Sequence, residues 1–307
     1  MKISIIGASG SLGSSTAYTI ALLGLADELV LLGRRRNFLL HHAGDISTAS
    51  LSQDVIVQAG EDKDLKDSDI VIMCAGAPEG AHFSSRRELV PPNIVIVKEA
   101  AEKIKRYCPD SIVITATAPV EAMNYGMYLG TGINRSKVLG YSLNDTLRFR
   151  NALALTLNVK PSRLEGIVIG EHGETQVMLF SSVKLDNRPY PLGENVKREV
   201  MGEVLGYLPW HISLKTGLTS GWTCASGIAS MVQAIKMNSE TMIPCSVVLS
   251  GEYGCREMSM TVPAIIWKNG VHKIEQMTLS DEEREKLQKS VDTIGSYTQF
   301  VHEVIGK

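Results

Sequence analysis

KISIIGASGSLG (residues 2–13) places a run of apolar residues directly before a glycine-rich turn. The apolar run predicts a buried strand, and the residues that follow Gly13 have a helical pattern. Glycines at such a turn permit a tight bend and let the backbone approach a pyrophosphate closely. The free N–H groups at the start of the following helix then face the phosphates. The stretch therefore predicts a strand, turn and helix that bind a dinucleotide.

The glycines of this turn have the spacing GxxGxxG instead of the commoner GxGxxG. Glycine-rich turns are common, so the spacing alone is weak evidence. Its position after a strand and before a helix makes the signal much stronger. The residues that we predict to contact the cofactor here are Gly7, Ser9, Gly10, Ser11, Leu12 and Gly13.

Apolar runs and helical stretches alternate through the first half of the chain. The further runs that predict strands are 28–33, 54–58, 69–74, 111–117 and 137–142, and helical patterns cover 14–23 and 93–107. Nearly continuous apolar runs are typical of parallel strands that are covered on both faces. We therefore predict a Rossmann doubly wound parallel sheet, of class α/β, over residues 1–145. Residues 146–307 change character, begin with a predicted helix over 146–158, and are expected to form an α+β catalytic domain.

The composition excludes several classes of partner. The 307-residue chain has a formal net charge of −2. It therefore lacks the excess of positive charge that would indicate binding to nucleic acid or to an anionic membrane. Its apolar runs have the length of strands, not of membrane spans. The N-terminal stretch lacks the pattern of a secretory signal, and the five cysteines are odd in number and form no CxxC pair. We therefore expect a cytoplasmic protein with reduced, mostly buried cysteines and no zinc site.

The end of the second predicted strand bears on the choice of cofactor. NAD sites usually have Asp or Glu there to hold the ribose hydroxyls. Here the strand ends in Gly33, Arg34, Arg35 and Arg36. Guanidinium groups would bind the 2′-phosphate that a carboxylate would repel, which favours NADP over NAD, although NAD is possible. The alternative is that the arginines form a solvated surface turn.

Two further stretches carry candidate catalytic groups. IGEHGET (169–175) places His172 in a loop after a predicted strand, and NDTLRFR (144–150) places Asp145 and Arg148 on one face of a helix start. Histidine exchanges a proton near neutral pH, a carboxylate can orient it, and arginine can hold a substrate carboxylate with two hydrogen bonds. Each residue also has a structural interpretation: an ordinary hydrogen-bonded histidine, a helix cap and a surface ion pair.

Taken in order, the glycine turn, NDTLRFR, IGEHGET, GEYG (251–254) and the C-terminal helix resemble the lactate/malate dehydrogenase family, and the archaeal-type malate dehydrogenases most of all. The resemblance covers essentially the whole chain. It implies that His172 donates and accepts the proton, that Asp145 pairs with it, and that Arg148 binds the C1 carboxylate of the substrate. It also implies a nicotinamide-dependent 2-hydroxyacid dehydrogenase that forms a homodimer or homotetramer and acts on a small 2-oxo or 2-hydroxy acid, malate being the family default.

AGAPEGAHFSSRREL (75–89) resembles the mobile lid of this family, which begins beside the cofactor, here at Ala75 and Gly76. The lid of the family carries an arginine that polarises the substrate carbonyl and supports its developing negative charge. The resemblance assigns this role to Arg86, three residues before a leucine. Arg87 is the alternative, because the loop is one residue longer than the family pattern.

Two positions depart from the family. Glu79 stands where malate enzymes have Arg and lactate enzymes have Gln, and it would repel a second substrate carboxylate unless Arg87 or His82 intervened. A neutral, hydroxylated, aromatic or cationic substrate side chain fits it better. In TATAP (115–119), Ala118 replaces the asparagine that hydrogen-bonds near the nicotinamide and the substrate oxygen, a loss for which Thr117 or Ser142 could compensate. Ser220 is the candidate for the small hydroxyl residue of the substrate pocket, with Thr219 and Thr223 as alternatives.

Two other functions compete with the dehydrogenase. A non-catalytic NADP-binding protein with a decayed site would explain Ala118, but the retention of His172, Asp145, Arg148 and a lid arginine opposes it. A glycosidase that uses transient oxidation would need metal ligands, for which the sequence shows no Cys/His constellation.

Overall fold

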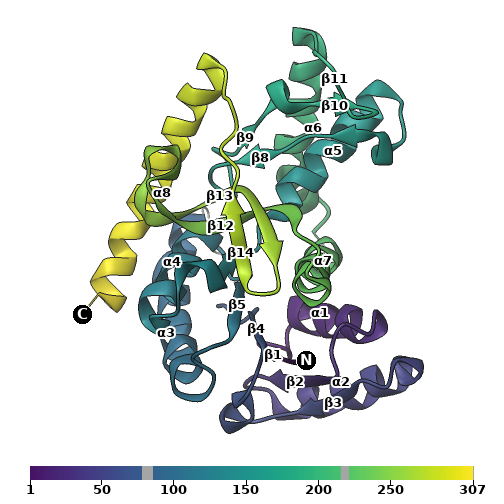
Figure 1. Ribbon diagram of the computed structural model, residues 1–307, viewed down its shortest axis with the longest axis vertical. Coiled ribbons are helices and arrows are strands. Elements are labelled where there is room, and N and C mark those ends of the chain that lie inside the picture. Colours follow the sequence, from purple (N-terminus) through teal and green to yellow (C-terminus); the bar gives the residue numbers. More distant parts are fainter. Residues whose placement is uncertain (78–85, 216–220, 307) are drawn as a thin grey trace.

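The computed structural model describes residues 1–77, 86–215 and 221–306. A nine-stranded sheet runs through the molecule (Figure 1). Its strands in spatial order are β14 (Gly270–Ile274), β13 (Arg256–Trp267), β12 (Thr241–Ser250), β6 (Val138–Gly140), β5 (Ile112–Thr115), β4 (Ile70–Met73), β1 (Lys2–Ile6), β2 (Glu28–Leu32) and β3 (Ile56–Ala59). The six strands from β3 to β6 are parallel, as the nearly continuous apolar runs predict.

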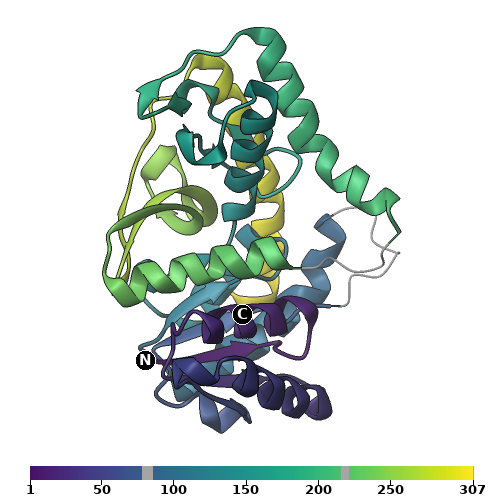
Figure 2. The same ribbon diagram turned by 90° about the vertical axis from the view of Figure 1, so that its right-hand side faces the viewer.

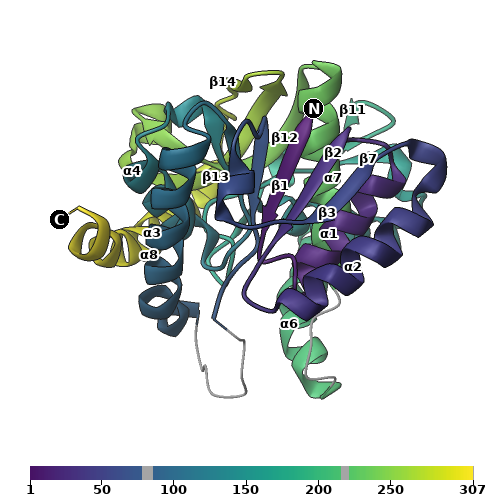
Figure 3. The ribbon, with the colours of Figure 1, turned by 90° about the horizontal axis from the view of Figure 1, so that it is seen from below.

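Helices cover both faces of this sheet, so successive strand residues enter two different cores. Ile3, Ile5 and Leu31 belong to one core, while Val30 and Met73 belong to the other. The helices that pack in the first core are α1 (Ser11–Leu22), α2 (Arg36–Ala49) and α7 (Trp222–Met237). Those in the second core are α3 (Val90–Tyr107), α4 (Val120–Thr131) and α8 (Asp281–Ile305). Figure 3 shows the two groups of helices on opposite sides of the strands. The predicted Rossmann arrangement is confirmed.

The parallel strands have the order 3-2-1-4-5-6, which reverses direction between β1 and β4. Crevices outside the carboxyl ends of strands at such a reversal are where open α/β sheets bind ligands. Gly7 follows β1 and Ala75 follows shortly after β4, so the glycine turn and the start of the AGAP stretch meet at this point.

The second half adds an antiparallel part to the same sheet. β12 pairs with β6 through Ser246 opposite Gly140, and β13 and β14 follow as antiparallel neighbours. A third core forms between α5 (Leu143–Leu157) and α6 (Glu194–Ser213). Small sheets complete this half: β7 (Leu164–Glu165), β10 (Lys184–Leu185) and β11 (Arg188–Pro189), with β8 (Val168–Ile169) and β9 (Val177–Met178) as a separate pair.

The two halves of the chain are connected through a helix. The predicted division after residue 145 falls inside α5, which begins at Leu143, three residues earlier than the predicted helix. α7 returns from the second half to pack across α1 (Figure 2). The long α8 begins with a capping box in which Ser280 accepts from the backbone N–H of Glu283 at 3.3 Å and the Glu283 carboxylate accepts from the backbone N–H of Ser280 at 2.9 Å. No helix within the described ranges is long and apolar enough to cross a membrane.

Candidate active site

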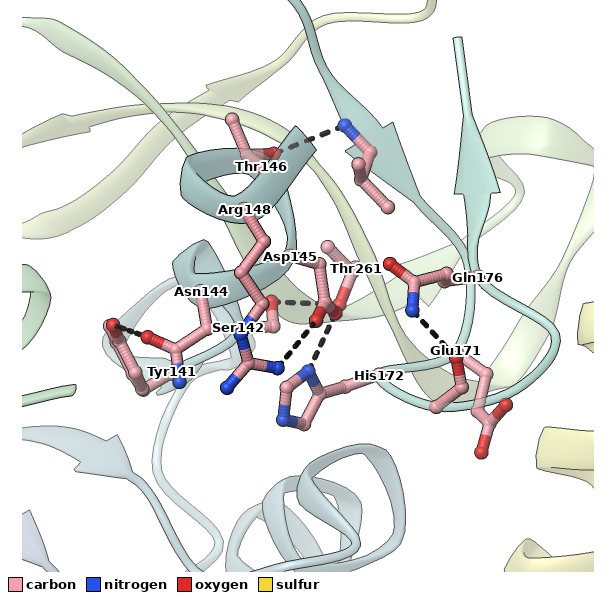
Figure 4. A network of polar contacts seen from close by, with 12 residues as sticks. Tyr141, Ser142, Asn144, Asp145, Thr146, Arg148, Glu171, His172, Gln176 and Thr261 are labelled. Carbon is pink, nitrogen blue, oxygen red and sulfur yellow. Dashed lines mark hydrogen bonds and ion pairs between the residues drawn. The ribbon is translucent and has the colours of Figure 1, made fainter. Parts of the chain in front are cut away.

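His172 and Asp145 form the closest ionisable pair of the site. The imidazole Nδ1 lies 2.6 Å from Oδ2 of Asp145, and the two side chains are 14% and 3% exposed. Figure 4 shows the imidazole and the Arg148 guanidinium side by side, both directed at the Asp145 carboxylate. If the carboxylate accepts a hydrogen bond from Nδ1–H, Nε2 is left as the nitrogen that can exchange a proton with a substrate.

The loop that carries His172 is held from three directions. Gly170 has a φ of +92° and exchanges backbone hydrogen bonds with Thr261 of β13 at 2.9 and 3.1 Å. The N–H of Glu171 donates to Ser290 Oγ of α8 at 2.5 Å. The N–H of His172 itself donates to Oε1 of Glu121, a buried residue in the first turn of α4, at 3.0 Å. These anchors restrict the histidine backbone before any substrate is present.

Asp145 and Arg148 come from the first turns of α5. The N-cap of this helix is Ser142, so the interpretation of Asp145 as a helix cap is wrong. Thr146 fastens the same turn to β8, because its Oγ1 accepts from the N–H of Val168 at 3.0 Å. The Asp145 carboxylate is therefore directed towards His172 by a helix that is itself tied to the strand before the histidine loop.

Arg148 lies beside the pair formed by His172 and Asp145, but its contact with Asp145 is long. Its Nη1 is 3.9 Å from Oδ1 of Asp145, which is an ion pair but too long for a hydrogen bond. Within the described part of the chain, no residue accepts a hydrogen bond from the Arg148 guanidinium. Its N–H groups can therefore take a substrate carboxylate, next to the imidazole that would exchange the proton.

The glycine turn forms a cradle that side chains would fill. Gly7 has a φ of +95°, and a Cβ there would lie 2.4 Å from the backbone nitrogen of Ala75. A Cβ on Gly13 would lie 2.4 Å from the carbonyl oxygen of Gly7. The N-cap of α1 is Gly10, and no acidic residue stands in its first turn, so the positive dipole end of the helix favours an anion. The residues fit a dinucleotide pyrophosphate.

Replacing Gly7 with alanine should damage this cradle. The new Cβ would meet backbone atoms in a conformation that side chains rarely adopt, which we expect to lower the free energy of unfolding by about 2–5 kcal/mol. Urea unfolding and fluorescence titration with NADH measure stability and cofactor affinity, and both should fall. Gly44→Ala is the control, because a Cβ there would meet no heavy atom within 4 Å and Gly44 lies outside the glycine turn. Equal losses in both variants would contradict the role of the close approach.

The three arginines after β2 have different surroundings. The Arg35 guanidinium donates to the Ser9 carbonyl of the glycine turn and stacks on Phe38, with Cζ 4.1 Å from the ring centroid. Arg36 donates to the carbonyl oxygens of Ala59 and Gly60, both at 3.0 Å. Arg34 is exposed. The solvated-turn interpretation is therefore too simple, because Arg35 lies against the turn that we predict to bind the cofactor.

Gly33, Ser9 and Leu12 also lie in this region. A Cβ on Gly33 would be 3.0 Å from Ser9 Oγ, so β2 ends in contact with the glycine turn. Ser11 begins α1, and Leu12 contacts Gly221 at the start of α7. The structure thus brings the predicted cofactor residues of two strands together.

The surroundings of Ala118 do not restore the missing amide. Thr117 Oγ1 donates to the Ala75 carbonyl at 2.7 Å, and Ser142 Oγ lies 2.7 Å from Thr261 Oγ1. Both hydroxyls are buried and already have internal partners. Asn93 of α3 donates instead to the Ala118 carbonyl at 2.6 Å and accepts from the N–H of Ala77, also at 2.6 Å, beside Gly76. Its amide therefore links the loops after β4 and β5.

Several predicted residues fall in the parts of the chain that are not described. Glu79, His82, Thr219 and Ser220 lie outside the described residues. Arg86 begins the short 3-10 helix η3 (Arg86–Leu89). Arg87 follows it, with its guanidinium 5.8 Å from the ring of Phe300 on α8. The assignment of the lid arginine stays a prediction.

A buried tyrosine contacts the residue before Asp145. Tyr141 Oη donates to Asn144 Oδ1 at 2.5 Å, and burial raises the pKa of this phenol.

Burial also raises the pKa of the Cys74 thiol to about 12. All five cysteines are free, with Cys108, Cys245 and Cys255 buried. Within the described ranges, no group of three or more His, Cys, Asp or Glu side chains could hold a metal ion.

Sequence reasoning missed several residues of the site. Glu121, Thr261 and Ser290 hold the histidine loop, and Tyr207 of α6 stacks on Arg148 with the guanidinium carbon 4.3 Å from the ring centroid. Glu121 was open to detection, because it follows Pro119 by two residues, and a proline followed by an acid is typical of a helix start. The others carry no local pattern that distinguishes them from ordinary strand and helix residues.

Comparisons with known proteins show the family of the chain. The model of the lactate/malate dehydrogenase NAD-binding domain matches residues 1–140, and that of the lactate/malate dehydrogenase alpha/beta C-terminal domain matches residues 143–303. The chain is 35% identical over 298 residues to a malate dehydrogenase of Pyrobaculum aerophilum, covering 95% of this chain and 96% of that protein. It is 31% identical over 297 residues to an L-lactate dehydrogenase of Halalkalibacterium halodurans, covering 95% of each.

A solved structure with a bound cofactor is also similar. The lactate dehydrogenase of Cryptosporidium parvum, complexed with lactic acid and nicotinamide adenine dinucleotide, superimposes with a TM-score of 0.89 at 29% identity. The match covers 98% of this chain and 97% of that one.

Proposed function

Because the chain belongs to the lactate/malate dehydrogenase family and is an oxidoreductase that acts on the CH–OH group of 2-hydroxy acids, we propose that His172, Asp145 and Arg148 carry out its acid–base and substrate-binding steps. The observation that carries this proposal is the cluster itself. A proton-exchanging imidazole, its buried carboxylate partner and a guanidinium open to an anion lie within one hydrogen bond or ion pair of each other.

Each of these residues has a separate task. Arg148 holds the C1 carboxylate and so places C2 of the substrate beside the imidazole. His172 gives a proton from Nε2 to the C2 oxygen during reduction and takes it back during oxidation, while Asp145 fixes the ring and stabilises its charged form. Arg86, or Arg87 in its place, polarises the C2 carbonyl from the lid. When bound, the nicotinamide supplies the hydride chemistry, and Gly7, Gly10 and Gly13 hold its pyrophosphate.

For the side chain of the substrate we propose a group that is not an anion, and is instead neutral, hydroxylated, aromatic or cationic. Glu79 would repel a second carboxylate, and Ala118 removes a donor that the family uses beside the substrate oxygen. The relatives include a malate dehydrogenase and an L-lactate dehydrogenase, whose named substrates differ in the side chain on C2. A decayed, non-catalytic NADP-binding protein is the second candidate, favoured by Ala118 alone.

The test of the function is a panel of 2-oxo acids with NADH and with NADPH, followed by the loss of reduced-nicotinamide absorbance. The panel spans oxaloacetate, pyruvate and branched, aromatic and hydroxylated acids. Turnover of an uncharged 2-oxo acid supports the proposed specificity, and rapid turnover of oxaloacetate identifies a malate dehydrogenase. Silence across the panel with cofactor binding intact would favour the non-catalytic alternative.

We propose NADP(H) as the preferred form of the cofactor. Arg35 supports it, because its guanidinium lies on the glycine turn at the end of β2, where Asp or Glu would serve NAD. In Arg35→Ala we expect the Kd for NADPH to rise about 10- to 100-fold, since hydrogen bonds to charged groups contribute about 1.5–3 kcal/mol. The Kd for NADH should change much less, as measured by fluorescence titration.

Arg36→Ala is the control for this cofactor test. Its guanidinium binds the carbonyls of Ala59 and Gly60, so its loss should lower stability without changing the ratio of the two Kd values. A wild-type preference for NADH, or an equal effect of Arg35→Ala on both cofactors, would overturn the NADP proposal.

We further propose that the protein is cytoplasmic and forms a homodimer or homotetramer, with residues 1–145 and 146–307 as its cofactor and substrate domains. Exposed apolar residues on α1 and α2, among them Tyr18, Leu22 and Leu40, support assembly with other copies. Light scattering coupled to size exclusion measures the assembly directly, and a monomer would reject it.

A further inference from the structure

Tyr207 makes a contact with the proposed substrate arginine that crosses between two helices. Its ring, from the C-terminal half of α6, lies under the guanidinium of Arg148 from α5, with 4.3 Å between Cζ and the ring centroid. The tyrosine is 37% exposed and the arginine side chain 29% exposed, so the contact lies at the protein surface of the site. A guanidinium over an aromatic face is attracted by the ring quadrupole.

Tyr207 is itself supported along α6. The ring of His211, one turn later, is nearly parallel to it, with an interplanar angle of 8° and 6.4 Å between centroids. The ring of Trp210 lies 5.7 Å from it. Three aromatic side chains thus form one face of the helix end, and the member nearest the site is the one that touches Arg148.

The chemistry of the guanidinium shows what this contact can do. An arginine binds a carboxylate through N–H groups that point outwards in its plane, so the orientation of the plane determines the direction of the fork. The guanidinium carbon of Arg148 lies over the ring of Tyr207, so the ring limits the movement of the guanidinium on that side. Asp145 at 3.9 Å attracts the charge but forms no hydrogen bond that would fix the plane. Among the described residues, the ring of Tyr207 is therefore the contact that can set the orientation of the guanidinium plane.

We infer that Tyr207 is a positioning residue, which holds the Arg148 guanidinium in the plane that receives the C1 carboxylate and forms an aromatic wall of the substrate site. This inference rests on the proposed function, because it takes Arg148 as the carboxylate-binding arginine. Tyr207 acts through Arg148 and exchanges no proton or hydride. Its loss should therefore weaken substrate binding more than it slows the bound complex.

The experiment compares Tyr207→Leu, which removes the aromatic ring, with Tyr207→Phe, which retains it. The probe is oxamate, a planar analogue of a 2-oxo acid, titrated calorimetrically in the presence of saturating reduced cofactor. We expect Tyr207→Leu to weaken oxamate about fivefold and to raise KM more than it lowers kcat, while the phenylalanine variant restores most of the affinity. Tyr190→Leu is the matched control, because Tyr190 is 38% exposed and lies on no described contact of the site.

A second measurement requires no substrate. Phenylglyoxal modifies accessible guanidinium groups, and peptide mass spectrometry follows the reaction at Arg148. Loss of the covering ring should speed modification of Arg148 several-fold in Tyr207→Leu and not in Tyr207→Phe or Tyr190→Leu. If the wild-type protein binds no oxamate and turns over no 2-oxo acid of the panel, the proposed function fails, while the modification rates still decide whether Tyr207 covers and orders Arg148.

Two results would overturn the inference. One is an unchanged Arg148 modification rate in Tyr207→Leu. The other is a loss of oxamate affinity that is equal in the leucine and phenylalanine variants, which would assign the effect to the hydroxyl. An equal loss in Tyr190→Leu would likewise show a general effect on the domain.

Discussion

Replacing His172 with asparagine should lower kcat about 10²–10⁴-fold, the usual contribution of a positioned general acid–base group. Asparagine keeps an N–H donor that can reach Asp145, so the loop and its hydrogen bond partner should be retained. What the variant loses is Nε2, the nitrogen that exchanges the proton with the substrate oxygen. The measurement is steady-state kinetics with the best 2-oxo acid of the panel, together with the Kd for the reduced cofactor, which should stay within about threefold because His172 is not part of the glycine cradle.

A second histidine variant separates this effect from general damage. His272 on β14 packs against Trp267 with 4.6 Å between ring centroids, and this described contact involves no residue of the site. His272→Asn should keep kcat near the wild-type value. A fall of less than tenfold in His172→Asn, at unchanged thermal stability, would remove His172 from the acid–base role.

Replacing Arg148 should affect kcat/KM by a comparable amount, for a different reason. Two hydrogen bonds to a charged carboxylate contribute about 3–6 kcal/mol in total, so Arg148→Gln should lower kcat/KM about 10²–10⁴-fold. Arg148→Lys keeps the charge but loses the planar fork. We therefore expect its kcat/KM to lie between those of Arg148→Gln and the wild-type protein. Both should act on KM as well as kcat, because a misplaced carboxylate also misplaces C2 relative to His172.

Arg163→Gln is the control for charge removal in the same half of the chain. Arg163 pairs with Asp186 at 2.5 Å on the surface, where an ion pair contributes little, so its loss should leave kcat/KM near the wild-type value. If Arg148→Gln retained more than about a tenth of the wild-type kcat/KM, another group would have to bind the C1 carboxylate, and the assignment of Arg148 would be wrong.

The elements of the N-terminal half follow closely from local patterns. Each predicted parallel strand is found, with ends that differ by a few residues, because a strand covered on both faces must be apolar throughout. The start of α5 was predicted three residues late, since Leu143 and Asn144 give no helical pattern of their own and Ser142 at the N-cap makes no side-chain cap hydrogen bond. Helix ends are set by capping and packing as well as by periodicity.

The sequence alone determined the alternation of strands and helices, the glycine turn after β1, and the i, i+3 placement of Asp145 and Arg148, since each depends on residues within one or two turns of chain. Only the tertiary structure decided that His172 meets Asp145, 27 residues away, at 2.6 Å, and that Glu121, 51 residues away, holds the same loop. It also decided that β12 to β14 extend the parallel sheet and that Tyr207 reaches Arg148. Contacts of this kind arise when separate elements pack around common cores, and no local period or spacing records which elements will become neighbours.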